Sequence, residues 1–320
     1  MIDTFDAYRN AADAGWLSAR VRGALWWDRS KGVEQLADLQ GRREQSAHGQ
    51  FCATSVKMMM DGVCETFTAA MGSPYFGEAG KGGTHAGALF IDAEEAAEAV
   101  HTLDDHGFQV HFHAIGDRAV TVALDAIGSL PEERRGMGRH HLAHLQFIAP
   151  DDLDRFRALG AIANFQPLWA CCDAQMEELT IPVVGEERAG WQYSIGSLHA
   201  RGARVAFGSD WPVSSPDPIQ EIHVAVNRRL SHHEGEAGTS GCEVPFRPEE
   251  SLAIADALHA FTSGVAYVNG DEGELGVIAP GFQADLVVLD QDLFGISPDT
   301  IGDTSVDVTI AAGRVVAGDE

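Results

Sequence analysis

The chain has 320 residues, and its 48 acidic residues outnumber its 22 Lys and Arg, which gives a formal net charge of -26. A surface this negative repels the phosphates of nucleic acids and the anionic face of a membrane, so both are disfavoured as partners. No apolar run approaches the roughly 20 residues that span a bilayer, and the first residues lack the pattern of a signal peptide. Five cysteines without a CxxC pair indicate reduced thiols. We therefore expect a cytoplasmic protein.

Short apolar runs rich in β-branched residues alternate with longer stretches of helical period, which is typical of βα units and a parallel sheet. The predicted strands are 19–27, 55–60, 109–115, 141–147, 161–167 and 204–210. Helices are predicted between them, at 92–106 with Asp92 as cap, at 117–130 with Asp117 as cap, and at 150–159 before Gly160. The chain is therefore expected to have an α/β fold.

The residue pattern of the sequence changes after residue 264, where the helical period ends. Strand-like runs follow at 286–290 and 308–316, separated by turns such as 279–282. These runs predict a small β appendage. The polar stretch 231–248 is predicted to be a surface loop at the mouth of a barrel.

Polar residues that could bind metal lie at or near the ends of predicted strands, where a parallel α/β barrel places its active site. They are Lys57, His113, His144 and Asp210. Each has an ordinary explanation: a lone histidine is more often a core or surface residue, and an Asp after a strand often caps the next helix.

Lys57 lies in an otherwise apolar run, where an ammonium group without a partner would be costly. Either its head reaches the barrel mouth and pairs with Asp61, or it is carbamylated and its new carboxylate bridges metal ions. His111 lies two residues before His113 and shares its face of the strand, so the two could also form a ligand pair.

Five segments, in this order and at these spacings, resemble the amidohydrolase superfamily, specifically the YtcJ-like (amidohydrolase 3) family. They are VKMMMDG (56–62), VHFHAIGDRAV (110–120), HLAHLQ (141–146), GSDWPV (208–213) and GELGVIAPGFQADLVVLD (273–290). The resemblance extends from about residue 4 to the C-terminus. It implies a TIM-like (β/α)8 barrel that hydrolyses C–N bonds of non-peptide amides or related small molecules, using one or two divalent metals, typically zinc, and a metal-activated water.

Carried over to matching positions, the resemblance implies that Lys57, as a carbamate, is the fourth-strand ligand, with His113 and His144 the ligands of the fifth and sixth strands. Asp210 would be the eighth-strand ligand and the catalytic proton acceptor. His111 matches no ligand of the family. The candidates for substrate binding, all near strand ends, are Asp61, Gln166, Trp169 and Trp211. Asp285, in the last segment, is expected to be a structural turn or strand-end residue.

The sequence departs from the family at its start. Family members begin with half of a β-sandwich and a first barrel strand carrying a His-x-His pair, and nothing before residue 111 has that pattern. We therefore expect an incomplete barrel of about six of the eight βα units over 1–263, and the C-terminal half of a small β-sandwich over 264–320.

The missing pair affects the two metal sites differently. The outer site, formed by Lys57, His113 and His144, is complete, whereas the inner site would need the absent pair. An active C–N hydrolase and an inactive or merely metal-binding form of one both remain open, with an unrelated barrel enzyme using His111 and His113 as a third alternative. Open barrel edges further predict poor solubility or a homo-oligomer. The substrate and the identity of the metal are not determined by these residues.

Overall fold

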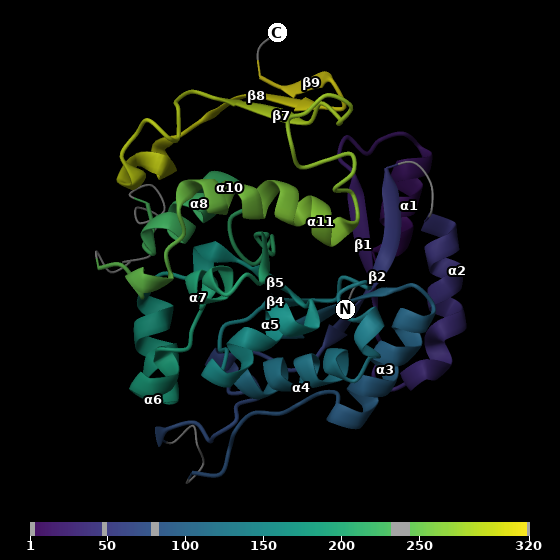
Figure 1. Cartoon of the computed structure of the whole chain (residues 1–320), viewed down its shortest axis with the longest axis vertical. Helices are drawn as coiled ribbons and strands as arrows, with labels where there is room; N and C mark the ends of the chain where they lie inside the picture. Colours follow the sequence, from purple (N-terminus) through teal and green to yellow (C-terminus); the bar gives the residue numbers. More distant parts are fainter. Residues whose placement is uncertain (1–3, 47–49, 78–82, 232–243, 319–320) are drawn as a thin grey trace.

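The computed structural model describes residues 4–46, 50–77, 83–231 and 244–318. A six-stranded sheet lies at the centre, with helices around it, and a separate small sheet lies at the C-terminal end of the chain (Figure 1). The central strands are β1 (Val21–Trp26), β2 (Phe51–Met59), β3 (Gln109–Ala114), β4 (His141–His144), β5 (Ile162–Phe165) and β6 (Arg204–Phe207). The α-helices are α1 (Phe5–Asp13), α2 (Leu36–Ser46), α3 (Ala93–Asp105), α4 (Asp117–Gly128), α5 (Leu153–Leu159), α6 (Ile181–Ala189), α7 (Ile195–Ala200), α8 (Pro218–Asn227), α10 (Ile254–His259) and α11 (Val265–Asn269).

Short helical turns and the strands of the second sheet complete the described elements. The turns are η1 (Gly32–Gln35), η2 (Cys64–Thr66), η4 (Glu132–Arg134), η5 (Pro150–Asp152), η6 (Pro167–Trp169), η7 (Met176–Thr180), η8 (Pro248–Glu250), η9 (Ala260–Gly264) and η10 (Pro298–Asp303). The second sheet contains β7 (Leu286–Leu289), β8 (Val306–Ala311) and β9 (Arg314–Ala317).

The central sheet has the strand order β1-β2-β3-β4-β5-β6, and every neighbouring pair is parallel. All six predicted strands are confirmed, with differences at their ends. The prediction for β2 was four residues short, because β2 begins at Phe51. The prediction for β4 was too long, because the φ angle becomes positive at its last residue, His144 (79°), and stays positive at Leu145 (52°), which ends the extended conformation.

The predicted helices are also present, with one correction at a cap. Asp92 caps α3 as predicted, accepting hydrogen bonds from the backbone N–H groups of Glu94 and Glu95. Asp117 does not cap α4: the N-cap is Gly116, and the Asp117 carboxylate instead accepts the N–H of Gly72. The segment 150–159 opens as the 3-10 turn η5 before α5 begins, and α5 ends at Gly160, whose φ of 66° suits glycine.

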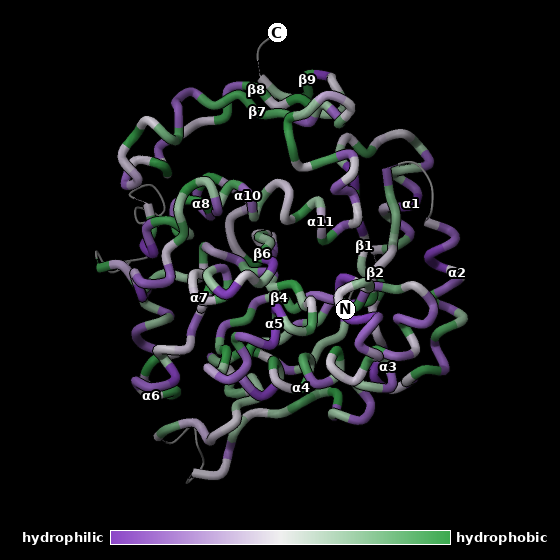
Figure 2. The backbone as a smooth tube through the Cα atoms, viewed as in Figure 1, coloured by the Kyte–Doolittle hydropathy of each residue, from purple (hydrophilic) through white to green (hydrophobic). Residues whose placement is uncertain are grey.

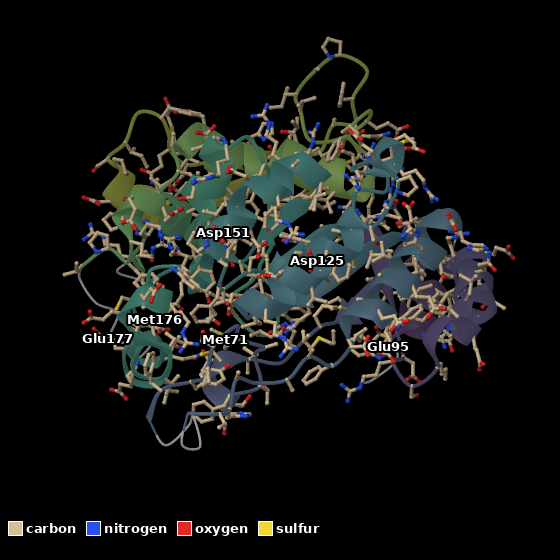
Figure 3. All side chains as sticks on the ribbon, turned by 60° about the horizontal axis from the view of Figure 1, so that its bottom comes forward. Met71, Glu95, Asp125, Asp151, Met176 and Glu177 are labelled. Carbon is tan, nitrogen blue, oxygen red and sulfur yellow. The ribbon has the colours of Figure 1, made fainter. Side chains whose placement is uncertain are left out.

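Side chains alternate along the strands and give the sheet two different faces. Val56 and Met58 of β2, and Met60 directly after it, are buried in the main hydrophobic core with residues of α3 and α4. Lys57 points the other way and lies beside His111 in the strand register. Charged residues such as Glu95 and Asp125 lie on the outer side of the helices that cover the apolar face (Figure 3). The polar face of the sheet therefore carries the candidate chemistry.

The helical run 254–269 closes part of that polar face. Val268 of α11 packs on Ile162 and Ala206, which point away from the main core. The run continues across residue 264, where the second domain was expected to begin, and leaves the helix at Gly270, whose φ is 76°. Arg22 of β1 then forms an ion pair with Asp271 at 2.8 Å, so the start of the C-terminal segment is fastened to the edge of the sheet.

The small antiparallel sheet corrects one prediction and confirms another. The run 308–316 is not one strand but parts of two, because Ala312 and Gly313 have φ angles of 50° and 76° and turn the chain between β8 and β9. Asp285 is structural as expected: its Oδ1 accepts the N–H of Ala312, and its other oxygen pairs with Arg20. The aliphatic residues of β7 and β8 appear in Figure 2 as a hydrophobic stretch remote from the main core.

Two further observations bear on the sequence predictions. β1 has a strand neighbour on one side only among the described residues, and β6 is the opposite end of the same sheet. Most of the predicted loop 231–248 lies outside the described residues. In the part of the chain that the structure describes, no helix is both long and apolar enough to cross a membrane.

Candidate active site

His113 lies at the end of β3 with its hydrogen-bonding direction fixed. Its Nε2 is 3.2 Å from the carbonyl oxygen of Gly62 and 3.8 Å from Oδ1 of Asp61. A carbonyl oxygen only accepts, so Nε2 carries the hydrogen and the lone pair is on Nδ1. Burial, together with the charge of Lys57, lowers the pKa of His113 to about 4. The imidazole is therefore neutral near pH 7, as a metal ligand must be.

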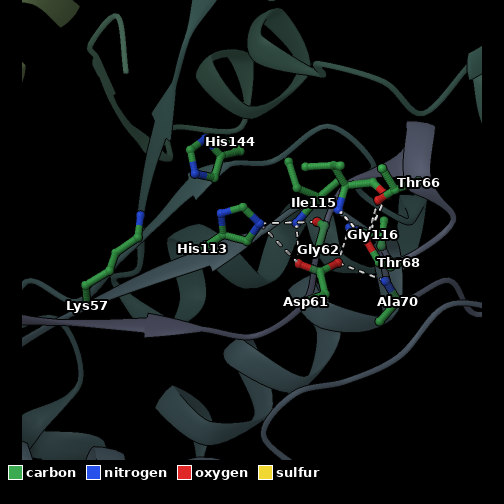
Figure 4. Close-up of polar contacts among 12 residues, drawn as sticks. Lys57, Asp61, Gly62, Thr66, Thr68, Ala70, His113, Ile115, Gly116 and His144 are labelled. Carbon is green, nitrogen blue, oxygen red and sulfur yellow. Dashed lines mark hydrogen bonds and ion pairs between the residues drawn. The ribbon is translucent and has the colours of Figure 1, made fainter. Parts of the chain in front are cut away.

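His144 follows β4 and is oriented by a different partner. Its Nδ1 donates to Oε1 of Gln166 at 2.8 Å, which leaves the lone pair on Nε2. Burial and the charge of Lys57 lower the pKa of His144 well below its usual range. The rings of His113 and His144 lie 4.5 Å apart between centroids (Figure 4). Two neutral imidazoles are thus brought together from neighbouring strands.

Lys57 points from β2 toward the same place (Figure 4). Its Nζ lies 2.9 Å from Nε2 of His111, its neighbour in the strand register, and not against Asp61 as one interpretation of the sequence expected. Burial lowers the pKa of Lys57 to about 8, while the carboxylate of Asp210 opposes that shift. A share of the lysine is therefore an uncharged amine near pH 8, the form that reacts with carbon dioxide.

Asp61 has a structural position in which no part of its side chain is exposed. Oδ2 accepts the N–H groups of Ala70 at 2.9 Å and Gly116 at 2.8 Å, and Oδ1 accepts the N–H of Ile115 at 3.0 Å (Figure 4). Burial raises the pKa of this carboxyl to about 7, and the three backbone donors oppose the shift. Asp61 was expected in the substrate pocket, but here it joins the 61–70 segment to the end of β3, behind His113.

The loop after β6 carries Asp210 and Trp211 at the surface. Asp210 has a φ of 53°, in the left-handed region that a non-glycine residue adopts at a cost. It does not cap the following helix, because Asp217 caps α8 by accepting the N–H of Ile219. Burial raises the pKa of Asp210 and the charge of Lys57 lowers it, so the two groups lie within electrostatic reach. The indole of Trp211 is 66% exposed, which leaves it accessible to a ligand.

Gln166 and His141 have contacts in the site that the sequence did not predict. Gln166 was expected to contact substrate, but its amide oxygen orients His144 and its amide nitrogen donates to Asn164 at 3.4 Å. His141 was not predicted to take part at all. It is paired with His111 in the register, with ring centroids 4.2 Å apart, and both line a cavity of about 220 Å³. The short spacing of His141 and His144 in one motif was the available signal.

The residues present fit a metal only with help from Lys57. Among the described residues, no three His, Cys, Asp or Glu side chains come together in a way that could hold a metal ion. His113 and His144 each direct one lone-pair nitrogen away from a fixed hydrogen bond, and the lysine adjoins them. A carbamate on Lys57 would add the third ligand, and three protein ligands are the usual number in catalytic zinc sites.

The chain belongs to the amidohydrolase family, which matches residues 2–317. It is 28% identical to YtcJ of Bacillus subtilis (strain 168) over 311 residues, which cover 97% of this chain and 54% of that protein. It is 26% identical over 210 residues to the N-substituted formamide deformylase of Arthrobacter pascens, covering 65% of this chain and 36% of that protein.

Among solved structures, an uncharacterized metal-dependent hydrolase from Pyrococcus furiosus superposes with a TM-score of 0.68 and 28% identity. The match covers 87% of this chain and 52% of the Pyrococcus chain. The chain thus spans about half the length of YtcJ and of this hydrolase. These likenesses support a divalent metal and hydrolase chemistry for the fold.

Proposed function

We propose that this chain carries the catalytic residues of a metal-dependent hydrolase that cleaves C–N bonds of small, non-peptide amides. The observation that carries the proposal is the pairing of His113 and His144, whose rings lie 4.5 Å apart with one nitrogen of each fixed by a protein acceptor. Two histidines that are only core residues would have no reason to direct their remaining nitrogens toward a shared space next to a lysine.

The metal would be held by Nδ1 of His113, Nε2 of His144 and a carbamate on Lys57. When bound, a divalent metal such as zinc supplies a Lewis acid that lowers the pKa of a water molecule to about 7 and polarises the scissile carbonyl. The carbamate forms when the lone pair of Nζ attacks the carbon of carbon dioxide and a proton leaves the nitrogen for solvent. The lowered pKa of Lys57 favours that reaction.

Asp210 is proposed as the group that moves the proton. Its carboxylate accepts a proton from the attacking water and then donates it to the leaving nitrogen. In the unmodified chain the charge of Lys57 opposes the effect of burial on the pKa of Asp210. A carbamate on Lys57 would remove that positive charge, and a bound divalent metal would then supply the charge that keeps the carboxylate available as a base. A role of Asp210 as a metal ligand would require a second metal site. The described residues contain no group of three His, Cys, Asp or Glu side chains that could hold it.

The substrate class rests on the relatives and on the aromatic residues near the site. One relative is by name a deformylase of N-substituted formamides, whose reaction breaks a C–N bond. The exposed indole of Trp211, next to Asp210, is proposed to contact the apolar part of such a substrate, and Trp169 and Gln166 to form the wall behind His144. Specificity would then depend on the loops after β5 and β6.

A second candidate is a form that binds metal weakly or not at all and does not catalyse. It is favoured by the absence, among the described residues, of a ligand group that works without carbamylation. Purified chain, dialysed against zinc with and without bicarbonate, would be measured for metal by mass spectrometry and assayed with a panel of N-formyl and N-acetyl amines. We expect about one zinc per chain, raised by bicarbonate, and product release.

Variants separate the two candidates. His113→Ala, His144→Ala and Lys57→Ala should each lose the zinc, whereas His199→Ala, which changes an exposed histidine paired with Asp256, should retain it. Asp210→Asn should bind zinc but lose activity. Zinc content unaffected by His113→Ala would contradict the proposed site, and full zinc without any hydrolysis would favour the second candidate.

We also propose the finer architecture that the sequence predicts. The central sheet is interpreted as six strands of a TIM-like barrel, with residues 1–263 as its domain, and β7–β9 as part of a small β-sandwich over 264–320. Within the described ranges, β1 has a strand neighbour on one side only, and this supports a homo-oligomer, since unpaired strand edges associate readily. A small-molecule partner and a cytoplasmic setting are also proposed, and the net charge of -26 disfavours nucleic acid or membrane surfaces as partners.

A further inference from the structure

Trp169 connects two parts of the proposed site that are far apart in sequence. Its indole stacks on His144, with ring centroids 5.4 Å apart and an interplanar angle of 14°. Its Nε1 donates to Oγ of Ser214 at 3.2 Å, in the loop after β6. Ser214 in turn donates to the carbonyl of Ser209 at 2.8 Å, directly before Asp210. A continuous set of contacts therefore runs from His144 to the backbone of Asp210.

The turn that carries Trp169 is itself held firmly. Oε2 of Glu221, a fully buried residue of α8, accepts the N–H of Leu168 at 2.7 Å. At the start of the same turn, Gln166 accepts the hydrogen bond from His144. Three contacts therefore fix the turn on α8, on His144 and on the Asp210 loop. Rotation of the indole away from His144 would break its hydrogen bond to Ser214.

His144 needs such support because its backbone is in an unfavourable conformation. Its φ of 79° lies in the left-handed region, which a non-glycine residue adopts at a cost, and His144 is the last residue of β4. The hydrogen bond that Nδ1 of His144 donates to Gln166 fixes one ring nitrogen but leaves rotation about that bond free. A flat ring stacked nearly parallel restricts that rotation, and it thereby determines where Nε2 points.

We propose that Trp169, held by Ser214, is a positioning residue that sets the ring plane of His144 for metal binding. The proposal rests on the function above, in which His144 is a ligand. Partners that orient a metal-bound histidine typically contribute 10- to 100-fold to affinity. Breaking the indole–hydroxyl bond should cost affinity in the lower part of that range, and removing the aromatic ring should cost more.

The test uses Zn²⁺ affinity and the visible spectrum of the Co²⁺-substituted protein, so no substrate is required. Trp169→Phe keeps a ring and loses the N–H donor, and Ser214→Ala loses the acceptor. Each should weaken Zn²⁺ binding about 10-fold and shift the Co²⁺ bands. The double variant should be no weaker than either single variant, because both remove the same bond. Ser214→Thr, which restores a hydroxyl, should return both measurements to wild-type values.

Trp169→Leu should weaken Zn²⁺ binding by up to about 100-fold, and Trp16→Phe, at a tryptophan that is 81% exposed, serves as the matched control and should change neither measurement. Wild-type affinity and spectrum in Trp169→Phe and Ser214→Ala would overturn the proposal, as would additive losses in the double variant. If His144→Ala binds Zn²⁺ like the wild type, the proposed function itself fails, and this outcome is distinct from the other two.

Discussion

Asp61 is a buried side chain whose conservative replacement should destabilise the fold. Asp61→Asn keeps the size of the side chain but leaves one oxygen where two accepted hydrogen bonds. That oxygen serves at most the pair of N–H groups now bonded to Oδ2, from Ala70 and Gly116. The N–H of Ile115 then faces an amide NH2 group and has no acceptor.

The magnitude follows from these bonds. At a pH of about 8, above the pKa of about 7 that burial gives the Asp61 carboxyl, the wild-type acceptor is ionised. A buried donor left without an acceptor then costs about 1–3 kcal/mol, and the two remaining bonds weaken because their acceptor is no longer charged. We expect the free energy of unfolding of Asp61→Asn to fall by about 2–4 kcal/mol. Asp61→Ala would leave three donors unsatisfied, and a cost of that size could prevent folding. The asparagine variant is therefore the informative one.

The measurement is equilibrium unfolding in urea, followed by circular dichroism. Asp151→Asn is the control, since Asp151 is exposed on the turn before α5 (Figure 3) and should change stability by less than about 0.5 kcal/mol. A midpoint for Asp61→Asn that equals the wild type, with an unchanged denaturant dependence, would refute the assignment of Asp61 as the acceptor of three backbone donors.

Two further predictions concern buried positions. Burial raises the pKa of Glu221 to about 8, so folding loses stability as pH rises from about 5 toward 8, where the unfolded state releases the proton and the folded state retains it. Glu221→Gln should flatten that dependence and melt higher than the wild type at pH 8, and equal pH slopes in both proteins would contradict it. A Cβ on Gly116 would lie 2.1 Å from the carbonyl oxygen of Ala70, so Gly116→Ala should cost at least about 2 kcal/mol. Gly41 lies inside α2, and a Cβ added there would meet no atom within 4 Å, so Gly41→Ala should instead stabilise the fold by about 0.5–1 kcal/mol. Melting temperatures of Gly116→Ala and Gly41→Ala that moved in the same direction would contradict these two predictions.

The local sequence was sufficient to predict which segments are strands. The strands β1–β6 fall within or around the six predicted runs, because β-branched and apolar residues with turn residues between them specify buried strands without reference to distant partners. Strand ends were less predictable. β4 stops at His144 because of a backbone conformation that residue type alone does not indicate.

For the candidate site, too, one part could be predicted from the sequence and another part could not. Lys57, His113, His144 and Asp210 could be selected from the sequence because strand ends meet at one edge of a parallel sheet. The contacts of each side chain could not be predicted from the sequence, because they depend on residues far away in the chain. Asp61 turned out to be an acceptor for backbone donors, and Lys57 pairs with His111 instead of with Asp61.

The sequence by itself therefore determined the family, the parallel order of the strands and the residue types available for chemistry, all of which follow from local patterns and motif spacing. Only the tertiary structure decided which nitrogen of each histidine is free. It brought the carbonyl of Gly62 to His113, and Gln166 and Trp169 to His144. The physical reason is that a hydrogen bond or a stacked ring depends on positions to within a fraction of an ångström, and such positions are set by packing of the whole fold.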